Sequence, residues 1–535
     1  MRVRWVLFAG ALLLGLTATG QETPSLSELT EMKREALAVF SEILQNGSAA
    51  ERLSAVNSLV RYGDDSVVPL LTERLLTDDA SFVRRAGAEG LFRFRSLPAV
   101  AAALRQAART DSVASIRWTA AISLGESDTI TELLAERETL AAAAVSLQEL
   151  TASGRLPQAG WRTTESALLS AFTDREAFNV VERAAMLKAL AQLRSLAAIA
   201  LFSQTLSDST EDPFVRGSGA FALGVLEVRH AVPELIWALS LDSEAIQVGA
   251  AGALGLLRDP VALGALSDLL LMGRAPQARV AAANALAPLG SQAVSALARA
   301  LLNDSEPTVR QAALRALRQI KGREATQAVL TFLASNYLQQ CDPSSCGSLA
   351  LETLKALAEL GQAQLALQVT QATLAALREA LPFLFIFAES DLVQTLSIVG
   401  RVAPELFDIV LKDPSPFVRA LGVAAFSVVY QDESRATLLK YISDENTLVR
   451  RAALEGLALW ATPDDTDLFA QFVSDRDPRT RVAALSALAR VGDVQALEPL
   501  RHALRSETAS VRLDGAGAAL AFAIRWLKAS HSSIP

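Results

Sequence analysis

An arginine recurs at intervals of 31 residues near the C-terminus of this 535-residue chain, at Arg419, Arg450, Arg481 and Arg512. With uneven spacers the same position is found further upstream, at Arg52, Arg84, Arg117, Arg183, Arg216, Arg279 and Arg310, and we expect Ala143, Gly249, Ala350 and Glu389 to fill the gaps. The chain then holds about fifteen copies of one unit, and a period in this range is typical of a stacked array of repeats. Function must therefore be sought on the surface of an array.

The residues that follow the arginine define one face of a helix. The third residue after it is usually small, as in Ala55, Gly87, Ala282, Ala313, Ala453 and Ala484. The seventh is usually leucine, as in Leu59, Leu91, Leu190, Leu286, Leu317, Leu457 and Leu488. Spacings of three, four and seven residues indicate a single buried helical face. Small residues on that face allow a neighbouring helix to approach closely.

Helix-start signals precede the arginine by four residues. Good N-cap residues stand there, namely Asp212, Ser415, Asn446, Asp477 and Thr508. Proline follows in several units, at Pro213, Pro307, Pro416 and Pro478, where its missing N–H costs nothing. Another apolar helix lies ahead of each cap, so each unit is predicted to be a helix, a short turn and a second helix that carries the arginine.

An aspartate stands six residues before the arginine in six units. The pairs are Asp78 and Arg84, Asp111 and Arg117, Asp304 and Arg310, Asp413 and Arg419, Asp444 and Arg450, and Asp475 and Arg481. With these pairs the chain resembles the HEAT-repeat family, most closely its short, alanine-rich phycobilisome-lyase repeats. The resemblance implies an all-α fold, a right-handed, armadillo-like α-solenoid of about fifteen helix pairs. It also implies that these aspartates and arginines form a hydrogen-bonded ladder between neighbouring units. We interpret the ladder as structural, because a catalytic group has no need to recur in every unit.

The sequence predicts three parts. Residues 1–20 have the layout of a signal peptide, with Arg2 and Arg4 before an apolar run and Ala18-Thr19-Gly20 at the cleavage site. Residues 21–46 are expected to form a capping helix that starts with a Ser25–Glu28 capping box. Residues 47–535 are expected to form one continuous solenoid, irregular near 125–180 and 322–400. We expect export to the periplasm or the outside of the cell, without stable membrane insertion after cleavage; an uncleaved leader that acts as an anchor is the alternative.

Two features of the region from 330 to 400 depart from the repeat. Cys341 and Cys346 enclose a short proline-containing loop, which in an exported protein predicts a disulfide. An apolar run contains Phe383, Phe385 and Phe387. These three phenylalanines are candidate partner-binding residues, because specific recognition needs a surface that differs from the one that every repeat presents. The alternative is that they fill a widened core between two irregular repeats.

The C-terminal segment from Leu520 to Leu527, with Phe522, Ile524 and Trp526, is strongly apolar. It either packs back on the array or offers a docking face, and packing is the favoured interpretation.

The net charge and the motifs of the sequence argue against nucleic-acid binding and against catalysis. The formal net charge of −8 argues against a nucleic-acid backbone as the main partner. The three histidines lie far apart, and no catalytic, cofactor-binding or metal-ligating motif was found. Gly249, Gly252 and Gly255 are spaced for close helix packing. We therefore expect an exported, non-enzymatic scaffold or adaptor for partner proteins. The alternatives are an enzyme or enzyme subunit of the bilin-lyase type and a self-associating subunit of the cell envelope.

Overall fold

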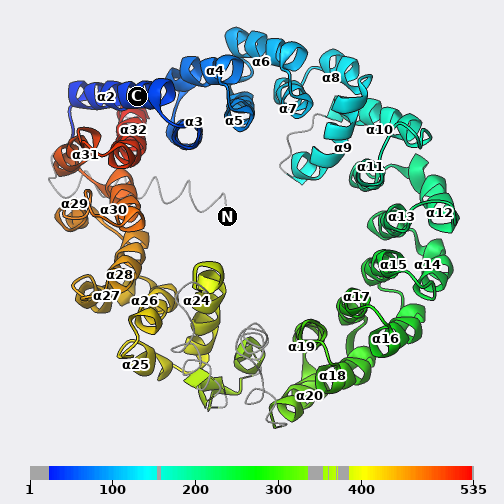
Figure 1. The fold of residues 1–535 in the computed structure, drawn as a ribbon. Helices are drawn as coiled ribbons and strands as arrows, with labels where there is room; N and C mark the ends of the chain where they lie inside the picture. The colour runs from blue at the N-terminus through cyan, green and yellow to red at the C-terminus, as the bar shows by residue number, and fades with distance from the viewer. Residues whose placement is uncertain are drawn as a thin grey trace. The chain divides into compact units, whose positions relative to one another are not determined.

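A computed structural model describes residues 23–152, 158–334 and 385–532, together with short pieces between 354 and 371. Within these residues every regular element is a helix, and the helices follow one another in pairs (Figure 1). The predicted α-solenoid is confirmed. The chain divides into two compact units, one made of Met1–Leu124 with Ile409–Pro535, the other of Gly125–Asp408.

The first unit takes helices from both ends of the chain. From the N-terminal part come α2 (Leu26–Asn46), α3 (Ala49–Tyr62), α4 (Val68–Thr77), α5 (Ser81–Leu91), α6 (Pro98–Thr110) and α7 (Ala114–Leu124). From the C-terminal part come α26 (Pro416–Tyr430), α27 (Arg435–Tyr441), α28 (Thr447–Leu459), α29 (Thr466–Ala470), α30 (Pro478–Val491), α31 (Leu497–Leu504) and α32 (Ala509–Ser532). The short α25 (Leu406–Val410) lies at the boundary between the units.

The second unit is continuous in sequence. Its helices are α8 (Ser127–Leu134), α9 (Arg137–Ala152), α10 (Gln158–Phe172), α11 (Val180–Gln192), α12 (Ile199–Ser207), α13 (Pro213–Val225), α14 (Val232–Leu239), α15 (Glu244–Leu257), α16 (Leu263–Met272), α17 (Pro276–Leu286), α18 (Val294–Asn303), α19 (Pro307–Ile320), α20 (Gly322–Ala334) and α24 (Phe385–Val402). In Figure 1 the second helices α11, α13, α15, α17 and α19 form one row, and α12, α14, α16 and α18 form another row beside it.

The predicted helix starts are present. Asp212, Asn446 and Asp477 each accept a hydrogen bond from a backbone N–H in the first turn of the helix that follows. Each of the four predicted prolines lies in the first turn of its own helix. Ser415 occupies the N-cap position without a side-chain bond of this kind. At the start of α2, Ser25 and Glu28 form the predicted capping box.

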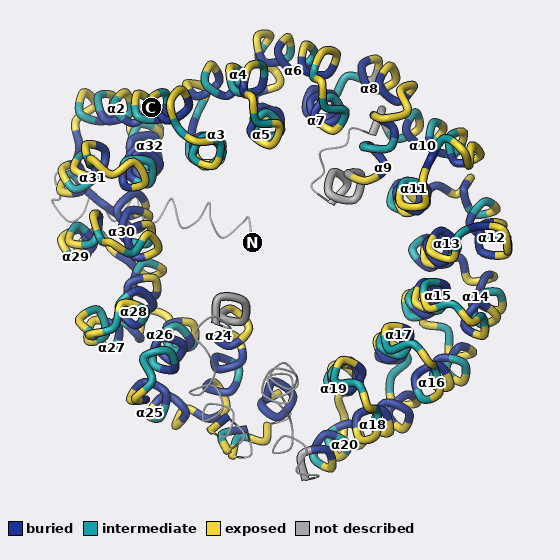
Figure 2. The backbone as a smooth tube through the Cα atoms, viewed as in Figure 1, coloured by how far each residue is buried: buried dark blue, intermediate teal, exposed yellow. Residues whose placement is uncertain are grey.

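The core follows the two repeated positions. Leucines at the seventh position and small residues at the third are buried, and Figure 2 shows buried backbone between the two rows of helices. Five of these leucines are fully buried: Leu59, Leu91, Leu190, Leu286 and Leu488. Because each second helix places this face against its neighbours, the other side of the helix remains for solvent or for a partner.

The two ends of the chain pack against each other within the first unit. Helix α2 lies along α32 and also contacts α31 (Figure 1). Met32 and Phe40 on α2 and Phe522 on α32 are fully buried. Around this core Glu35 pairs with Arg505 and Glu42 pairs with Arg512, each at 3.2 Å. The favoured interpretation of the C-terminal helix is therefore confirmed: it packs. Helix α2 also contacts α3 and α4, so it packs against helices from both ends of the chain.

Several predictions lie outside the described residues. These are the leader at residues 1–20, Cys341, Cys346 and Phe383. Phe385 and Phe387 fall in the first turn of α24, and only the backbone is described there.

One helical stretch of the described residues, Pro276–Asn303, is long and apolar enough by composition to cross a membrane. It comprises α17, the 3-10 segment η6 (Ala287–Ala293) and α18, and half of its most apolar window is buried. Gly290 within it has φ 76°, which breaks the helix. The stretch is thus two helices of the solenoid core.

Candidate functional site

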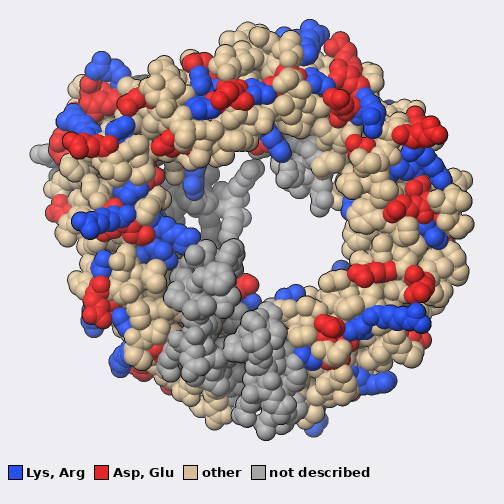
Figure 3. Space-filling view, viewed as in Figure 1, with Lys and Arg blue, Asp and Glu red and all other residues tan. Residues whose placement is uncertain are grey.

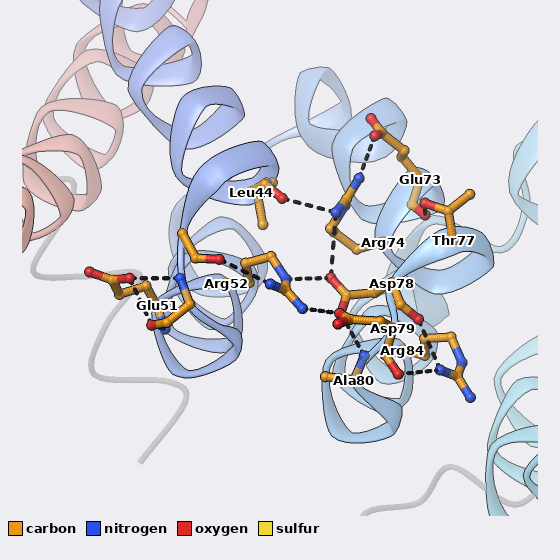
Figure 4. Close-up of polar contacts among 12 residues, drawn as sticks. Leu44, Glu51, Arg52, Glu73, Arg74, Thr77, Asp78, Asp79, Ala80 and Arg84 are labelled. Atoms are coloured by element: carbon orange, nitrogen blue, oxygen red, sulfur yellow. Dashed lines mark hydrogen bonds and ion pairs between the residues drawn. The ribbon is translucent and has the colours of Figure 1, made fainter.

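The polar network predicted from the repeat is built at the turns, and Figure 4 shows its first rung. The guanidinium of Arg52 on α3 donates from Nε to Oδ2 of Asp78 at 2.9 Å and from Nη2 to Oδ1 at 2.8 Å. Its third nitrogen donates to the carbonyl of Gly47 at 2.9 Å. Because Asp78 belongs to the following repeat, this planar fork ties two successive second helices together.

The same contact joins other neighbouring repeats. It is found between Arg84 and Asp111, Arg279 and Asp304, and Arg419 and Asp444, at 2.8, 2.9 and 3.2 Å. Each carboxylate is thus held by the arginine of the preceding repeat. The arginine six residues after each aspartate instead donates to its backbone carbonyl, as found for Asp78–Arg84, Asp111–Arg117, Asp304–Arg310, Asp413–Arg419, Asp444–Arg450 and Asp475–Arg481.

The aspartate also fixes its own turn. Asp78 accepts a hydrogen bond from the backbone N–H of Ala80, two residues ahead. Burial alone would raise the pKa of the Asp78 carboxyl, but the hydrogen bonds from Arg52 and Ala80 outweigh it and lower that pKa below its ordinary value. The ladder aspartate is therefore ionised at neutral pH and satisfied on both sides. This geometry is that of a structural tie.

The ladder has departures that the sequence pattern did not show. Among the described residues, Arg450 donates only to the carbonyls of Asp444 and Glu445 and to the hydroxyl of Thr447. Arg481 reaches Asp514 on α32, at 2.8 Å, in place of a turn aspartate. These two rungs therefore differ from the four regular ones.

One further rung and one further arginine position use other residues. Arg183 binds Glu211, at 2.6 Å, and both side chains are buried. In the next unit but one, Gln247 donates to the carbonyls of Leu239 and Leu241 and so occupies the arginine position. The expectation that Gly249 fills that position was wrong by two residues, because only four residues separate α14 from α15 and the position falls at Gln247.

Repeats around α13, α15 and α17 are joined by glycines. A Cβ added at Gly217, Gly224, Gly249 or Gly255 would lie under 3.0 Å from backbone of the neighbouring helix. Gly249 faces Gly217 itself, and Gly255 faces the Cα of Ala285. The prediction that Gly249 and Gly255 serve close helix packing is confirmed; Gly252 instead lies beside the ring of Phe221.

These glycine-packed repeats expose large apolar side chains on their free side. On α13, Phe214 is 45% and Phe221 is 37% exposed, and on α15 Val248 is 36% and Leu256 is 47% exposed. We call these four residues the α13–α15 surface. On the neighbouring α11, the ammonium of Lys188 lies 5.2 Å from the centre of the Phe214 ring. In the view of Figure 3, charges of both signs are interspersed around the molecule without one large patch of a single sign.

This surface was not predicted from the sequence, because it lies on regular repeats and not where the repeat pattern breaks. A signal was present: Phe214 stands two residues before Arg216 and Phe221 five residues after it. Neither position falls on the face marked by the small residue Gly219 and by Leu223, both of which are buried. An aromatic pair seven residues apart on the opposite face of a regular helix therefore points outward.

Within the described part of the chain, no group of three or more His, Cys, Asp or Glu side chains is arranged to hold a metal ion.

Similarity to known proteins was found at the level of the repeat. The sequence model for HEAT repeats matches residues 37–125, 209–287, 265–341 and 435–521, which together cover more than half of the chain. No curated protein matches the sequence.

Solved structures with a similar course of the chain include Kap95p with RanGDP, the Kap95:Nup1 complex and importin beta. The TM-scores are 0.44, 0.44 and 0.38, and the identities are 14%, 14% and 13%. The alignments cover 93%, 89% and 90% of this chain and 76%, 80% and 79% of the others.

Proposed function

Because the chain belongs to the HEAT-repeat family, we propose that it is an exported, non-enzymatic scaffold or adaptor that binds partner proteins on the exposed side of its second helices. The observation that carries this proposal is the α13–α15 surface. Two phenylalanines and two aliphatic side chains lie exposed on adjacent helices whose backbones are in contact. Aromatic residues on a rigid support are the groups that dominate protein–protein binding energy.

The chemistry of the α13–α15 surface indicates what kind of surface the partner presents. Single exposed apolar side chains are common on soluble proteins, whereas several on one face of adjacent helices indicate an interaction site. Lys188 beside Phe214 adds one positive charge at the edge. We therefore expect the partner to present an apolar segment, with an acidic group at the end that contacts α11.

The proposal is tested by replacing the apolar groups without disturbing the packing beneath them. The double variant Phe214→Ser with Leu256→Ser should lose at least about tenfold in partner capture from the native cell envelope, because truncated hot-spot residues cost more than about 1 kcal/mol each. The matched control is Val261→Ser with Met272→Ser, in the same unit, where both side chains are 72% exposed. Equal capture by the two double variants would refute the proposal.

The earlier prediction for Phe383, Phe385 and Phe387 enters the same experiment as a third arm. Serine at these three positions should weaken capture if they contribute to binding, and should lower the melting temperature if they fill a core.

Export is proposed from the leader, whose charge, apolar run and small residues agree. We expect cleavage after Gly20 and a disulfide between Cys341 and Cys346. The intact mass of the exported protein checks the cleavage, and free-thiol titration without reductant checks the disulfide. A full-length mass in the membrane fraction would favour the anchor alternative.

Two other functions are distinguished by simple measurements. The resemblance to phycobilisome-lyase repeats suggests an enzyme or enzyme subunit of the bilin-lyase type, which would change the absorption spectrum of a bilin in the presence of an acceptor protein. A self-associating envelope subunit would elute as an oligomer, and its mass would be measured by light scattering. An adaptor gives neither result.

A further inference from the structure

A small cavity lies in the first unit, apart from the α13–α15 surface. It has a volume of about 220 Å3 and is bounded by the short helix η8 (Gln431–Ser434), α27, the end of α28, and η9 (Pro463–Asp465). Pockets for drug-sized ligands have roughly 300–1,000 Å3. This cavity is therefore suited to one side chain rather than to a large ligand.

The floor and one wall of the cavity are apolar. Leu438 and Leu457, which are 1% and 2% exposed, form the floor. Trp460 follows the last residue of α28 and is 40% exposed, so its indole forms a wall that solvent can reach. An apolar floor beside an indole accommodates an alkyl chain, and the indole face attracts a cation more strongly than any other side chain ring.

The rim carries an excess of negative charge. Asp432 and Asp464 line the cavity, and both are exposed. Neither carboxylate accepts a hydrogen bond or forms an ion pair with another described residue. Arg435 also lines the cavity, and its pKa is raised by hydrogen bonding to Asp465 and, less, by the charge of Asp464. Its guanidinium is bound to both carboxylate oxygens of the buried Asp465, so three carboxylates face one guanidinium and the group keeps a negative net charge. The Asp465 carboxylate also accepts the N–H of Thr462 at 2.8 Å.

We propose that this cavity, the Trp460 pocket, binds the cationic side chain of a lysine or arginine on a partner protein. The alkyl stem would lie on Leu438 and Leu457, the charge over the indole of Trp460, and the two free carboxylates would complete the contact. Charge complementarity selects this occupant: an acidic side chain would meet two like charges, and a neutral one would leave both carboxylates without a partner. The proposal stands independently of the α13–α15 surface.

The test uses the full chain labelled with 5-fluorotryptophan, in which the Trp460 resonance is assigned by its loss in Trp460→Phe. A capped Gly-Arg-Gly peptide should shift this resonance in a saturable manner, and its citrulline counterpart, which has a similar shape and no charge, should not. The double variant Asp432→Asn with Asp464→Asn should bind the arginine peptide at least about tenfold less tightly than the wild type.

The control for charge is Asp467→Asn, an exposed aspartate on the neighbouring α29 that does not line the cavity. It should leave the affinity unchanged, and an otherwise unchanged fluorine spectrum shows that each variant is folded. The proposal is overturned if the citrulline peptide binds equally well, or if the double variant keeps the wild-type affinity. It is also overturned if tetramethylammonium binds more tightly than the arginine peptide, because the pocket would then serve a free quaternary amine.

Discussion

Neighbouring repeats of this chain are joined in two ways. Between α3 and α5, the contact is a guanidinium fork from Arg52 to Asp78, with nitrogen–oxygen distances of 2.8 and 2.9 Å. Between α13 and α15, Gly217 and Gly249 bring the two backbones together with no room for a Cβ. The first joint is polar and lies at the turns, whereas the second is steric and lies along the helices. The glycine-packed repeats are also the ones that expose Phe214, Phe221 and Leu256. A repeat whose neighbours are fixed by backbone contact can present apolar groups on its free side, although Phe221 also covers Gly252 of the neighbouring helix.

The largest effect should come from adding one methyl group to the steric joint. In Gly249→Ala the new Cβ would meet the backbone of Gly217, which cannot move aside as a side chain can. We expect a loss of about 3 kcal/mol in the free energy of unfolding, at the upper end of the range for overpacking. Denaturant unfolding measures it.

The matched control is Gly264→Ala on α16, where a Cβ would meet no atom within 4 Å. It should be neutral or stabilising by up to about 1 kcal/mol, since alanine favours helix. If both variants lose the same stability, close approach is not what joins these repeats.

At the polar joint, the loss of stability on replacing an arginine by alanine should depend on whether that arginine binds a carboxylate. Arg419→Ala removes a fork to Asp444 and leaves that carboxylate without its arginine, so we expect a loss of about 2–3 kcal/mol. Arg450→Ala removes bonds to two carbonyls and a hydroxyl, so the loss should be about 1 kcal/mol. The comparison uses thermal and denaturant unfolding of both variants. A larger loss at Arg450 would contradict the assignment of the fork as the joint.

Acidification should weaken the polar joint selectively. The pKa of Asp78 is lowered in the folded state, mainly by Arg52 acting against burial. Its contribution to stability is therefore complete above the ordinary aspartate pKa of about 4 and is lost as the pH falls through the lowered folded value. Asp78→Asn should be less stable at pH 7 and should lose less stability than wild type between pH 4 and 2. Parallel curves for the two proteins would show that this carboxylate does not contribute.

The smallest effect should be that of Lys188→Gln, which removes the ammonium next to Phe214. An exposed cation–π contact contributes about 0.5–1 kcal/mol. Thermal unfolding should therefore barely change, while an acidic partner should bind less tightly to the α13–α15 surface. A large loss of stability would instead assign Lys188 to the packing of α11 on α13.

The repeat architecture was predictable because its signals are local. N-caps, prolines and the small and leucine positions are read within one unit, and Asp212, Asn446 and Asp477 act as expected. The participants of each rung were harder to predict, since Arg52 selects Asp78, 26 residues ahead, rather than an aspartate in its own unit. The candidate surface was missed for a different reason: the departures from the repeat pointed to residues 330–400, whereas the spacing of Phe214 and Phe221 on a regular helix already indicated two outward-pointing rings.

The contact between α2 and α32 has a consequence for how the chain acquires its structure. Most contacts in a solenoid are short in sequence, so repeats can fold as they are synthesised. The Glu35–Arg505 pair, by contrast, spans 470 residues. Met32 and Phe40 on the first helix therefore have no C-terminal partner until the last helix has been made. Such a late, long-range contact slows the final folding step and leaves an apolar helix face open to aggregation until that step is complete. Because the chain leaves the ribosome N-terminus first, this face would need protection for the whole of its synthesis.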